Sequence, residues 1–216
     1  MAWTYSQLEA FETCPRQYYE VRVKKSIPYV QNESAKWGDT VHKAIEHRIM
    51  NATPLPEGMH QWEGIVNKFA ALPGKKIAEQ KIAITSDFQP CDYFAKNAWS
   101  RGNIDLSVVC GKTAMVTDWK TGKRKLTDQT YLYAGYVLIH NPAVEKVHTS
   151  FVWLKERKVD TETVTREDMP HHWQKLLARY RRIEIAHEKN QWPATPSGLC
   201  KSYCPVTSCE FCGRGG

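Results

Sequence analysis

A β-hairpin in the middle of the chain constrains the fold more than any other segment. Residues 104–110 and 113–120 are rich in β-branched side chains, and residues 111–112, Gly-Lys, are a two-residue turn signal with glycine first. Counting outward from this turn places Asp105 opposite Asp118, with Cβ atoms about 5 Å apart. Opposed carboxylates repel each other unless a cation lies between them or one is protonated. The hairpin therefore predicts a cation site, unless a bulge or another register separates the two acids.

The second strand of this hairpin supplies the residues for chemistry. Side chains alternate along a strand, so Asp118 and Lys120 share one face, while Trp119 points to the other face and can anchor the strand in a core. An acid and an ammonium group on one face can bind a divalent metal and position a water beside it. A helix capped by residue 127 or 128 follows, and Gln129 and Tyr133 lie four residues apart on one of its faces.

An earlier amphipathic helix offers a further ligand. Apolar residues recur with helical spacing over residues 37–50, and His42 and Glu46 lie four apart on one face beside that stripe. A histidine in such a place is more often packed or exposed than bound to a metal. Its assignment therefore depends on the other motifs.

The remaining segments predict an α/β fold in a single domain. The apolar spacing changes from period 3.6 to period 2 after residues 73–74, as expected when strands follow helices. We expect a central mixed β-sheet that contains the 104–120 hairpin and is flanked by helices. The other expected elements are a helix that begins with a Ser6-x-x-Glu9 capping box and ends near Thr13, a second helix from Pro15, helices over 62–69 and 173–183, and strands over 77–84, 93–99, 147–154 and 159–164.

Charge and composition restrict the class of protein. The 216 residues carry a net charge of +7, which favours polyanions through attraction to phosphates. No run approaches the roughly 18 apolar residues of a membrane helix. The first six residues also lack the charged-then-apolar plan of a signal peptide. We therefore expect a soluble, cytoplasmic protein.

The cysteines form a second group of candidate ligands. The chain has seven, and Cys200, Cys204, Cys209 and Cys212 all lie within its last seventeen residues. In a reducing compartment such crowding indicates a metal or a cluster rather than disulfides.

Five short motifs follow one another along nearly the whole chain. They are Tyr5-Ser6-x-Leu8 followed by Cys14-Pro15, Gly38-x-x-x-His42, Gly102-x-x-Asp105, Asp118-x-Lys120 with Thr121-Gly122-Lys123, and Gln129-x-x-x-Tyr133. In this order, and with the terminal cysteines, the chain resembles the RecB-like nucleases of the PD-(D/E)XK superfamily, including the CRISPR-associated and phage-encoded exonucleases. The resemblance implies a restriction-endonuclease-like core with a cysteine-rich C-terminal cap.

The resemblance also implies roles for individual residues. The metal ligands for Mg²⁺ or Mn²⁺ would be His42, Asp105, Asp118 and the backbone carbonyl of Trp119. Lys120 would help to generate or orient the attacking water. Gln129 and Tyr133 would line the site and contact the nucleic acid backbone.

The iron–sulfur subset of this family implies a [4Fe-4S] cluster. One ligand would be Cys14, and the others Cys200, Cys204 and Cys209, with Cys212 as an alternate, although the cysteine spacing departs from the usual one of that subset. The competing hypothesis is a structural Zn²⁺ held by the four C-terminal cysteines. Residues 1–35 and 191–216 would form this cap, whereas Cys91 and Cys110 are interpreted as buried hydrophobic residues.

The function expected from these features is metal-dependent DNA cleavage, by an exonuclease that acts on single strands or ends. The basic tracts 123–125 and 179–182 would guide the strand, and recombination, repair or CRISPR-type proteins would be its partners. Two alternatives stay open. One is a nuclease-fold module that binds DNA or a partner without cleaving, and the other is a structural zinc or Fe–S interaction protein.

Overall fold

The computed structural model describes residues 2–125 and 127–213. These residues fall into two compact units. The larger unit contains Ala2 and residues 32–174, and the smaller unit contains residues 3–31 and 175–213.

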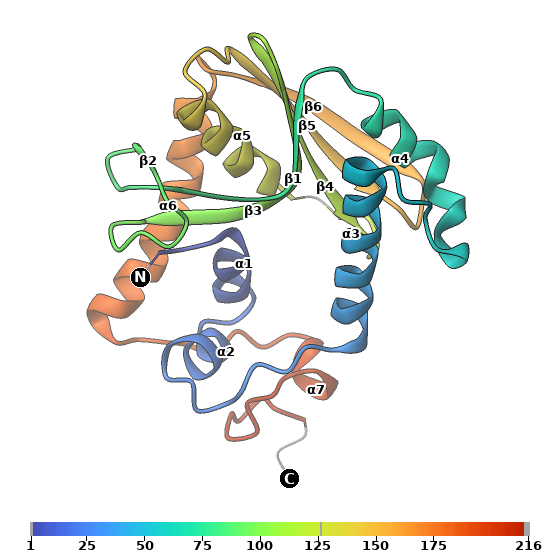
Figure 1. Cartoon of the computed structure of the whole chain (residues 1–216). Coiled ribbons are helices and arrows are strands. Elements are labelled where there is room, and N and C mark those ends of the chain that lie inside the picture. Colours follow the sequence, from blue (N-terminus) through green and yellow to red (C-terminus); the bar gives the residue numbers. More distant parts are fainter. Residues whose placement is uncertain (1, 126, 214–216) are drawn as a thin grey trace. The chain divides into compact units, whose positions relative to one another are not determined.

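A six-stranded mixed sheet organises the larger unit (Figure 1). Its spatial order is β2-β1-β3-β4-β5-β6, and only β4 and β5 run parallel. The parallel pair is joined through helix α5, as expected for a crossover connection. The strands are β1 (Lys75–Ile84), β2 (Pro90–Cys91), β3 (Ser100–Cys110), β4 (Thr113–Lys120), β5 (Lys146–Trp153) and β6 (Lys158–Thr165). The predicted α/β fold with a central mixed sheet is confirmed.

The register of the β3–β4 hairpin agrees with the count from its turn. The paired residues run from Cys110 with Thr113 to Leu106 with Thr117, without a bulge. The pairing ends one residue short of Asp105 and Asp118. The two acids therefore lie where the strands stop pairing, which leaves their polar groups available to other partners.

Helices α3 (Glu33–Asn51) and α4 (Glu63–Ala70) pack against the hairpin. Helix α3 begins where the side chain of Asn32 accepts a hydrogen bond from the Ala35 N–H, a typical N-cap. Val41 and Ile45 of α3 are fully buried in the same cluster as Trp119, whose ring meets Phe69 edge-on at 5.1 Å between centroids. Trp119 thus anchors β4, as predicted, and turns its neighbours Asp118 and Lys120 to the other face.

The other helices of the larger unit are η2 (Glu57–Trp62), a 3₁₀ helix, and α5 (Gln129–His140). Residues 130 and 132–138 of α5 are all buried, with exposed fractions of at most 5% for its large side chains. A helix that is apolar on nearly all sides lies in a core. This burial fixes the direction in which the first turn of α5 presents its polar residues.

The prediction of a strand over residues 93–99 is wrong. The only pairing in this region is the two-residue β2, and consecutive turns follow, closed by hydrogen bonds from Ala95 N–H to Asp92 O and from Ala98 N–H to Ala95 O. Phe94 is 77% exposed. Successive turns prevent the extended backbone that the aromatic and β-forming residues favoured.

The smaller unit is helical. It contains α1 (Tyr5–Thr13), α2 (Pro15–Tyr18), the π-helical turn η1 (Tyr19–Val23), residues 175–189 of α6 (Met169–Lys189) and α7 (Leu199–Ser202). The C-terminal end of α1 and the start of α2 agree with the predictions from Thr13 and Pro15. The capping box, however, is formed by Thr4 and Gln7 rather than Ser6 and Glu9, because the helix already begins at Tyr5.

The N-terminal and C-terminal segments of the smaller unit are tied together. Trp192 stacks on Tyr19 at 5.0 Å and meets Phe11 edge-on at 6.3 Å. Arg179 makes a two-pronged ion pair with Glu12, with both N–O distances 2.7 Å. Aromatic packing and charge therefore hold residues more than 160 positions apart in one unit.

Candidate active site

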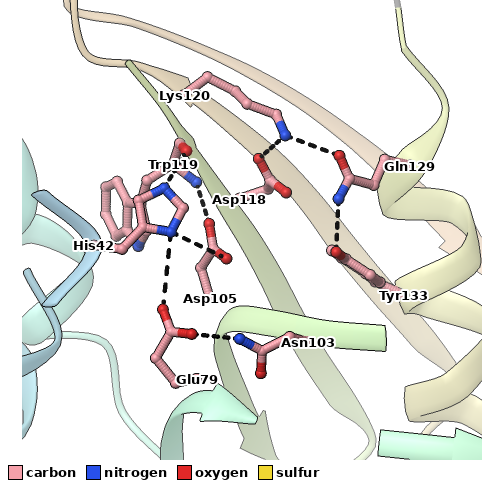
Figure 2. A network of polar contacts seen from close by, with 9 residues as sticks. All are labelled: His42, Glu79, Asn103, Asp105, Asp118, Trp119, Lys120, Gln129 and Tyr133. Atoms are coloured by element: carbon pink, nitrogen blue, oxygen red, sulfur yellow. Dashed lines mark hydrogen bonds and ion pairs between the residues drawn. The ribbon is translucent and has the colours of Figure 1, made fainter. Parts of the chain in front are cut away.

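Polar side chains gather at the open end of the β3–β4 hairpin (Figure 2), and Asn103 and Asp105 of β3 line a polar cleft there. Asp105 is only 9% exposed, and its Oδ2 accepts a 2.7 Å hydrogen bond from the N–H of Trp119. This bond replaces the next pair of the ladder and holds the Asp105 carboxylate beside β4. The cleft has a volume of about 430 Å³ and is lined by Asp39, His42, Lys43, Glu46, Glu79, Asn103 and Asp105.

Three ligand-bearing side chains converge in this cleft. One ligand atom from each of His42, Glu79 and Asp105 lies within 4.8 Å of the other two. Nδ1 of His42 is 3.5 Å from Asp105 Oδ1 and 3.8 Å from Glu79 Oε1. Nε2 of the same ring is 2.8 Å from the carbonyl oxygen of Trp119, to which it can only donate. A neutral ring then has its lone pair on Nδ1, which points toward both acids and suits a divalent metal.

Glu79 belongs to this group, although strand alternation alone left open whether it faces a site or solvent. It sits in β1 opposite Asp105 with a φ of +47°, and it is the one position where the β1–β3 pairing is interrupted. A positive φ is costly for a glutamate, so such strain is typical of a functional site. Asn103 donates a hydrogen bond to Glu79 Oε2 and holds the carboxylate in place. An acid within an otherwise regular strand was the only sequence signal.

A second chain of polar contacts runs from Asp118 to Tyr133 (Figure 2). Nζ of Lys120 lies 2.7 Å from Asp118 Oδ2 and donates a 2.8 Å hydrogen bond to Gln129 Oε1. The amide of Gln129 in turn donates to the hydroxyl of Tyr133 at 2.6 Å. Asp118 is 2% exposed and Tyr133 5%. Each of these side chains has a defined partner, so the ammonium group of Lys120 is held in one position.

The carboxylates are electrostatically coupled. Burial raises the pKa of Asp105 well above its usual range, and the charges of Asp118 and Glu79 raise it further, against the lowering effect of the Trp119 N–H and Lys120. Burial, and then the negative charges of Asp118 and Asp105, also raise the pKa of the Tyr133 hydroxyl, which therefore stays protonated. Excess negative charge of this kind favours a bound cation.

Gly102 allows α5 to pack closely against β3. A Cβ built at this position would lie 3.0 Å from ring atoms of both Tyr133 and Tyr136. The hydroxyl of Tyr136 is hydrogen-bonded to Ser100 at 2.5 Å, so this ring has little room to move. The glycine of the Gly102-x-x-Asp105 motif thus allows the Tyr133 ring to lie directly against β3.

The predicted site residues are thus gathered in one place, with one difference in grouping. Nδ1 of His42 faces Asp105, whereas Nε2 of the same ring faces the Trp119 carbonyl. Lys120, Gln129 and Tyr133 form one network. Asp118 is paired with Lys120, whereas Glu79 completes the compact ligand group.

The cysteines lie apart from this cleft in sequence, and those of the predicted cap lie within the smaller unit. Among the described residues, all seven are free thiols. Burial raises the pKa of Cys204, and the nearby Cys212, Cys200 and Cys14 add to this effect, against one lowering hydrogen bond from the backbone at Val206. Cys91 is partly buried but Cys110 is exposed at the hairpin turn, so the interpretation of Cys110 as a buried residue is wrong.

Comparison with known proteins agrees with the fold. The model of the PD-(D/E)XK nuclease superfamily matches residues 2–210. The chain therefore belongs to this superfamily, and the mixed sheet with its acid–lysine strand is the core of a nuclease. No helix among the described residues is long and apolar enough to cross a membrane.

Two solved structures are similar to the chain at low sequence identity. The "Putative exonuclease" of Eubacterium rectale is 12% identical, with a TM-score of 0.56 over 100% of this chain and 88% of that one. The structure named SSO0001 is 15% identical, with a TM-score of 0.46 over 98% and 87% of the two chains. At this low identity, the likeness to the first structure concerns the fold alone. No curated protein matches the chain.

Proposed function

We propose that this protein is a metal-dependent deoxyribonuclease that degrades DNA from its ends, with single strands or ends as substrate. The observation that carries the proposal is the convergence of His42, Glu79 and Asp105 beside the Asp118–Lys120 pair. In the cell such an enzyme would work in the cytoplasm beside recombination, repair or CRISPR-type proteins that produce or use DNA ends.

The donor set fits Mg²⁺ or Mn²⁺. Carboxylate oxygens are the ligands of hard cations, and an imidazole shifts the preference toward Mn²⁺. We assign His42, Asp105 and Asp118 to this ion, with Glu79 as an added ligand. The Trp119 carbonyl accepts the hydrogen bond from Nε2 of His42 and so orients the ring instead of binding the ion. When bound, the metal supplies Lewis-acid stabilisation of the charge that develops on the phosphate oxygens.

The chain's own residues position the nucleophile. Lys120 can hydrogen-bond an attacking water while Gln129 holds its ammonium group from the other side. A fixed cation next to the reacting phosphate also stabilises its developing negative charge. Tyr133 stays protonated and keeps Gln129 oriented, and both residues can contact the nucleic acid backbone.

A cleavage assay tests this function. We expect end-labelled linear DNA to be degraded with Mg²⁺ or Mn²⁺ and to be stable in EDTA, because the acids cannot stabilise the transition state without a cation. A closed circular single strand should survive, since it offers no end. Cleavage of the circle at the same rate would show endonuclease action, and no cleavage of any DNA with either metal would contradict the proposal.

The raised pKa of Asp105 predicts a pH-dependent effect of metal on stability. An acid whose pKa is raised by folding stabilises the folded state at pH values below the usual aspartate pKa. This contribution is lost as the pH rises through the raised pKa of the folded state. A cation between the carboxylates offsets that loss. We therefore expect Mn²⁺ to raise the Tm by several degrees more at pH 8 than at pH 5, measured by calorimetry.

Asp105→Asn is the control for this measurement, because an amide does not titrate. The metal-free variant should lose less stability than the wild type between the two pH values. A metal-induced Tm shift that is equal at pH 5 and pH 8 in the wild type would contradict the prediction.

We also propose a [4Fe-4S] cluster in the smaller unit, in preference to Zn²⁺. Backbone N–H groups of Thr195 and Ser197 approach Sγ of Cys14 and Cys200 at 3.5 and 3.4 Å, and hydrogen bonds to sulfur are typical of cluster ligands.

The fourth ligand of this cluster is either Cys209 or Cys212. Cys212, Cys200 and Cys14 lie close enough to Cys204 to raise its pKa, which favours Cys212 in the set. Cys209 is half-buried against the same apolar cluster as Cys204. The proposal keeps Cys14, Cys200 and Cys204 as ligands, and the cap formed by residues 1–35 and 191–216 would enclose them.

A further inference from the structure

We propose that the sheet surface next to the metal cleft is a track for a single strand of nucleic acid, on which a base stacks against Phe94 and the phosphates meet Lys81 and Arg101. The track is made by the β1–β3 pair and by the loop over residues 92–96. The proposal rests on the proposed nuclease function and adds how the substrate strand reaches the cleft.

The strand register connects this surface to the metal cleft. Asn103 lines the cleft and donates to Glu79, and Lys81 is its cross-strand partner in β1. Arg101 lies two residues from Asn103 in β3, so the two side chains share one face, about 7 Å apart along the strand. Lys81 and Arg101 therefore continue the line that begins at the metal ligands.

An exposed aromatic pair ends this line. The rings of Tyr93 and Phe94 meet edge-on at 5.0 Å, and Phe94 is 77% exposed, so one face of its ring is open to solvent. Nζ of Lys81 lies 5.7 Å from the centre of the Phe94 ring, and the guanidinium of Arg101 lies 5.3 Å from that of Tyr93. Arg101 also donates to the Tyr93 carbonyl at 3.3 Å, which holds the loop to β3.

The two cations of the track are available to phosphates. Among the residues that the structure describes, neither Lys81 nor Arg101 has a carboxylate partner. The basic tracts noted in the sequence differ in this respect. Arg124 is bound by Asp160 through two hydrogen bonds of 2.7 and 2.5 Å, and Arg181 is bound by Glu184 and Glu188.

This combination of groups favours a single strand over a duplex or a peptide. Interleaved cations and aromatic rings bind the backbone charge and the flat faces of unpaired bases without regard to sequence. In a duplex the base faces are already stacked on one another, so an exposed phenylalanine gains nothing from them. An acidic peptide would satisfy the cations but would leave the aromatic pair unused.

Fluorescence anisotropy with a 5′-labelled dT12 strand in EDTA tests the track without cleavage. We expect Phe94→Ala to weaken binding about tenfold and Phe94→Trp to retain it, because stacking on one base is lost in the first and kept in the second. Lys81→Ala should weaken binding. It should also reduce the slope of log K against the logarithm of the salt concentration by about 0.7, which corresponds to the loss of one phosphate contact. Lys75→Ala is the matched control, an exposed lysine near the other end of β1.

Several outcomes would overturn the proposal. If the Phe94→Ala and Lys81→Ala variants bind dT12 with wild-type affinity, the proposal is wrong. The proposal is also wrong if Phe94→Ala weakens the binding of a 12-base-pair duplex as much as the binding of dT12, since that would exclude stacking on unpaired bases. Binding of a polyglutamate peptide with the same dependence on Phe94 would assign the surface to acidic peptides instead.

A small substrate separates this proposal from the nuclease function. Bis(p-nitrophenyl) phosphate is a diester without a nucleotide strand that could follow the track, so Phe94→Ala should hydrolyse it at the wild-type rate with Mn²⁺. A Phe94→Ala variant that lost this activity would show damage to the cleft and would contradict the track. If the wild type cleaves neither this diester nor DNA, the nuclease function fails, while the dT12 measurements still decide the track.

Discussion

Replacing Lys120 by alanine is expected to reduce DNA cleavage by about 10³-fold without unfolding the protein. Lys120 is held between Asp118 and Gln129 at 2.7 and 2.8 Å, so its ammonium group is fixed beside the carboxylates. A preorganised cation that orients the water and stabilises developing charge contributes on this scale. Asp118→Asn should cause a loss of the same order. The measurements are single-turnover cleavage rates of end-labelled DNA in Mn²⁺, with circular dichroism to verify folding.

Lys112→Ala is the matched control for this prediction. Lys112 also pairs with a carboxylate, that of Glu145 at 2.6 Å, but it lies in the hairpin turn at the other end of β4 and is exposed. Its replacement should leave the cleavage rate within about twofold of the wild type, because exposed ion pairs contribute little even to stability. Cleavage by folded Lys120→Ala at the wild-type rate would refute the assignment of this lysine.

Replacing Cys14 or Cys204 by alanine is expected to remove the cluster. Protein purified without oxygen should be brown, absorb near 400 nm and contain about four iron atoms per chain, and each variant should contain less than about one. Cys14 lies in the N-terminal part of the smaller unit and Cys204 in the C-terminal part. Loss of a ligand would therefore also remove a tie between chain ends, and the Tm should decrease, because metal binding contributes directly to folding.

Two further variants complete this test. Cys91→Ala removes a partly buried thiol of the larger unit and should leave iron content and colour unchanged. Comparison of Cys209→Ala with Cys212→Ala identifies the fourth ligand, since only one should lose iron. Colourless wild-type protein that contains one zinc ion per chain would reverse the preference for iron.

Where local geometry sufficed, the sequence predicted how the candidate site residues are placed relative to one another. The two-residue turn at residues 111–112 set the register, and strand alternation separated Trp119 from Asp118 and Lys120. Helical spacing put Gln129 and Tyr133 on one face, where they are hydrogen-bonded at 2.6 Å. These relations span one to thirteen residues and follow from backbone periodicity.

Prediction from sequence was wrong where the local pattern allowed more than one outcome. Ser6 and Glu9 match a capping box as well as Thr4 and Gln7 do, and the actual start of the helix decides between them. The segment 93–99 has strand-forming residues, but consecutive turns prevent it from pairing. No single-residue preference resolves such a choice, because packing of the neighbouring elements determines it.

The sequence by itself thus determined the class of fold, the hairpin that carries Asp105 and Asp118, and the residues around Lys120. Only the tertiary structure decided that Glu79 joins His42 and Asp105, since this depends on a positive φ in β1 and on its pairing with β3, some 25 residues away. The track past Phe94 has the same origin. Contacts between separate strands and loops depend on the whole packed sheet, which no local spacing encodes.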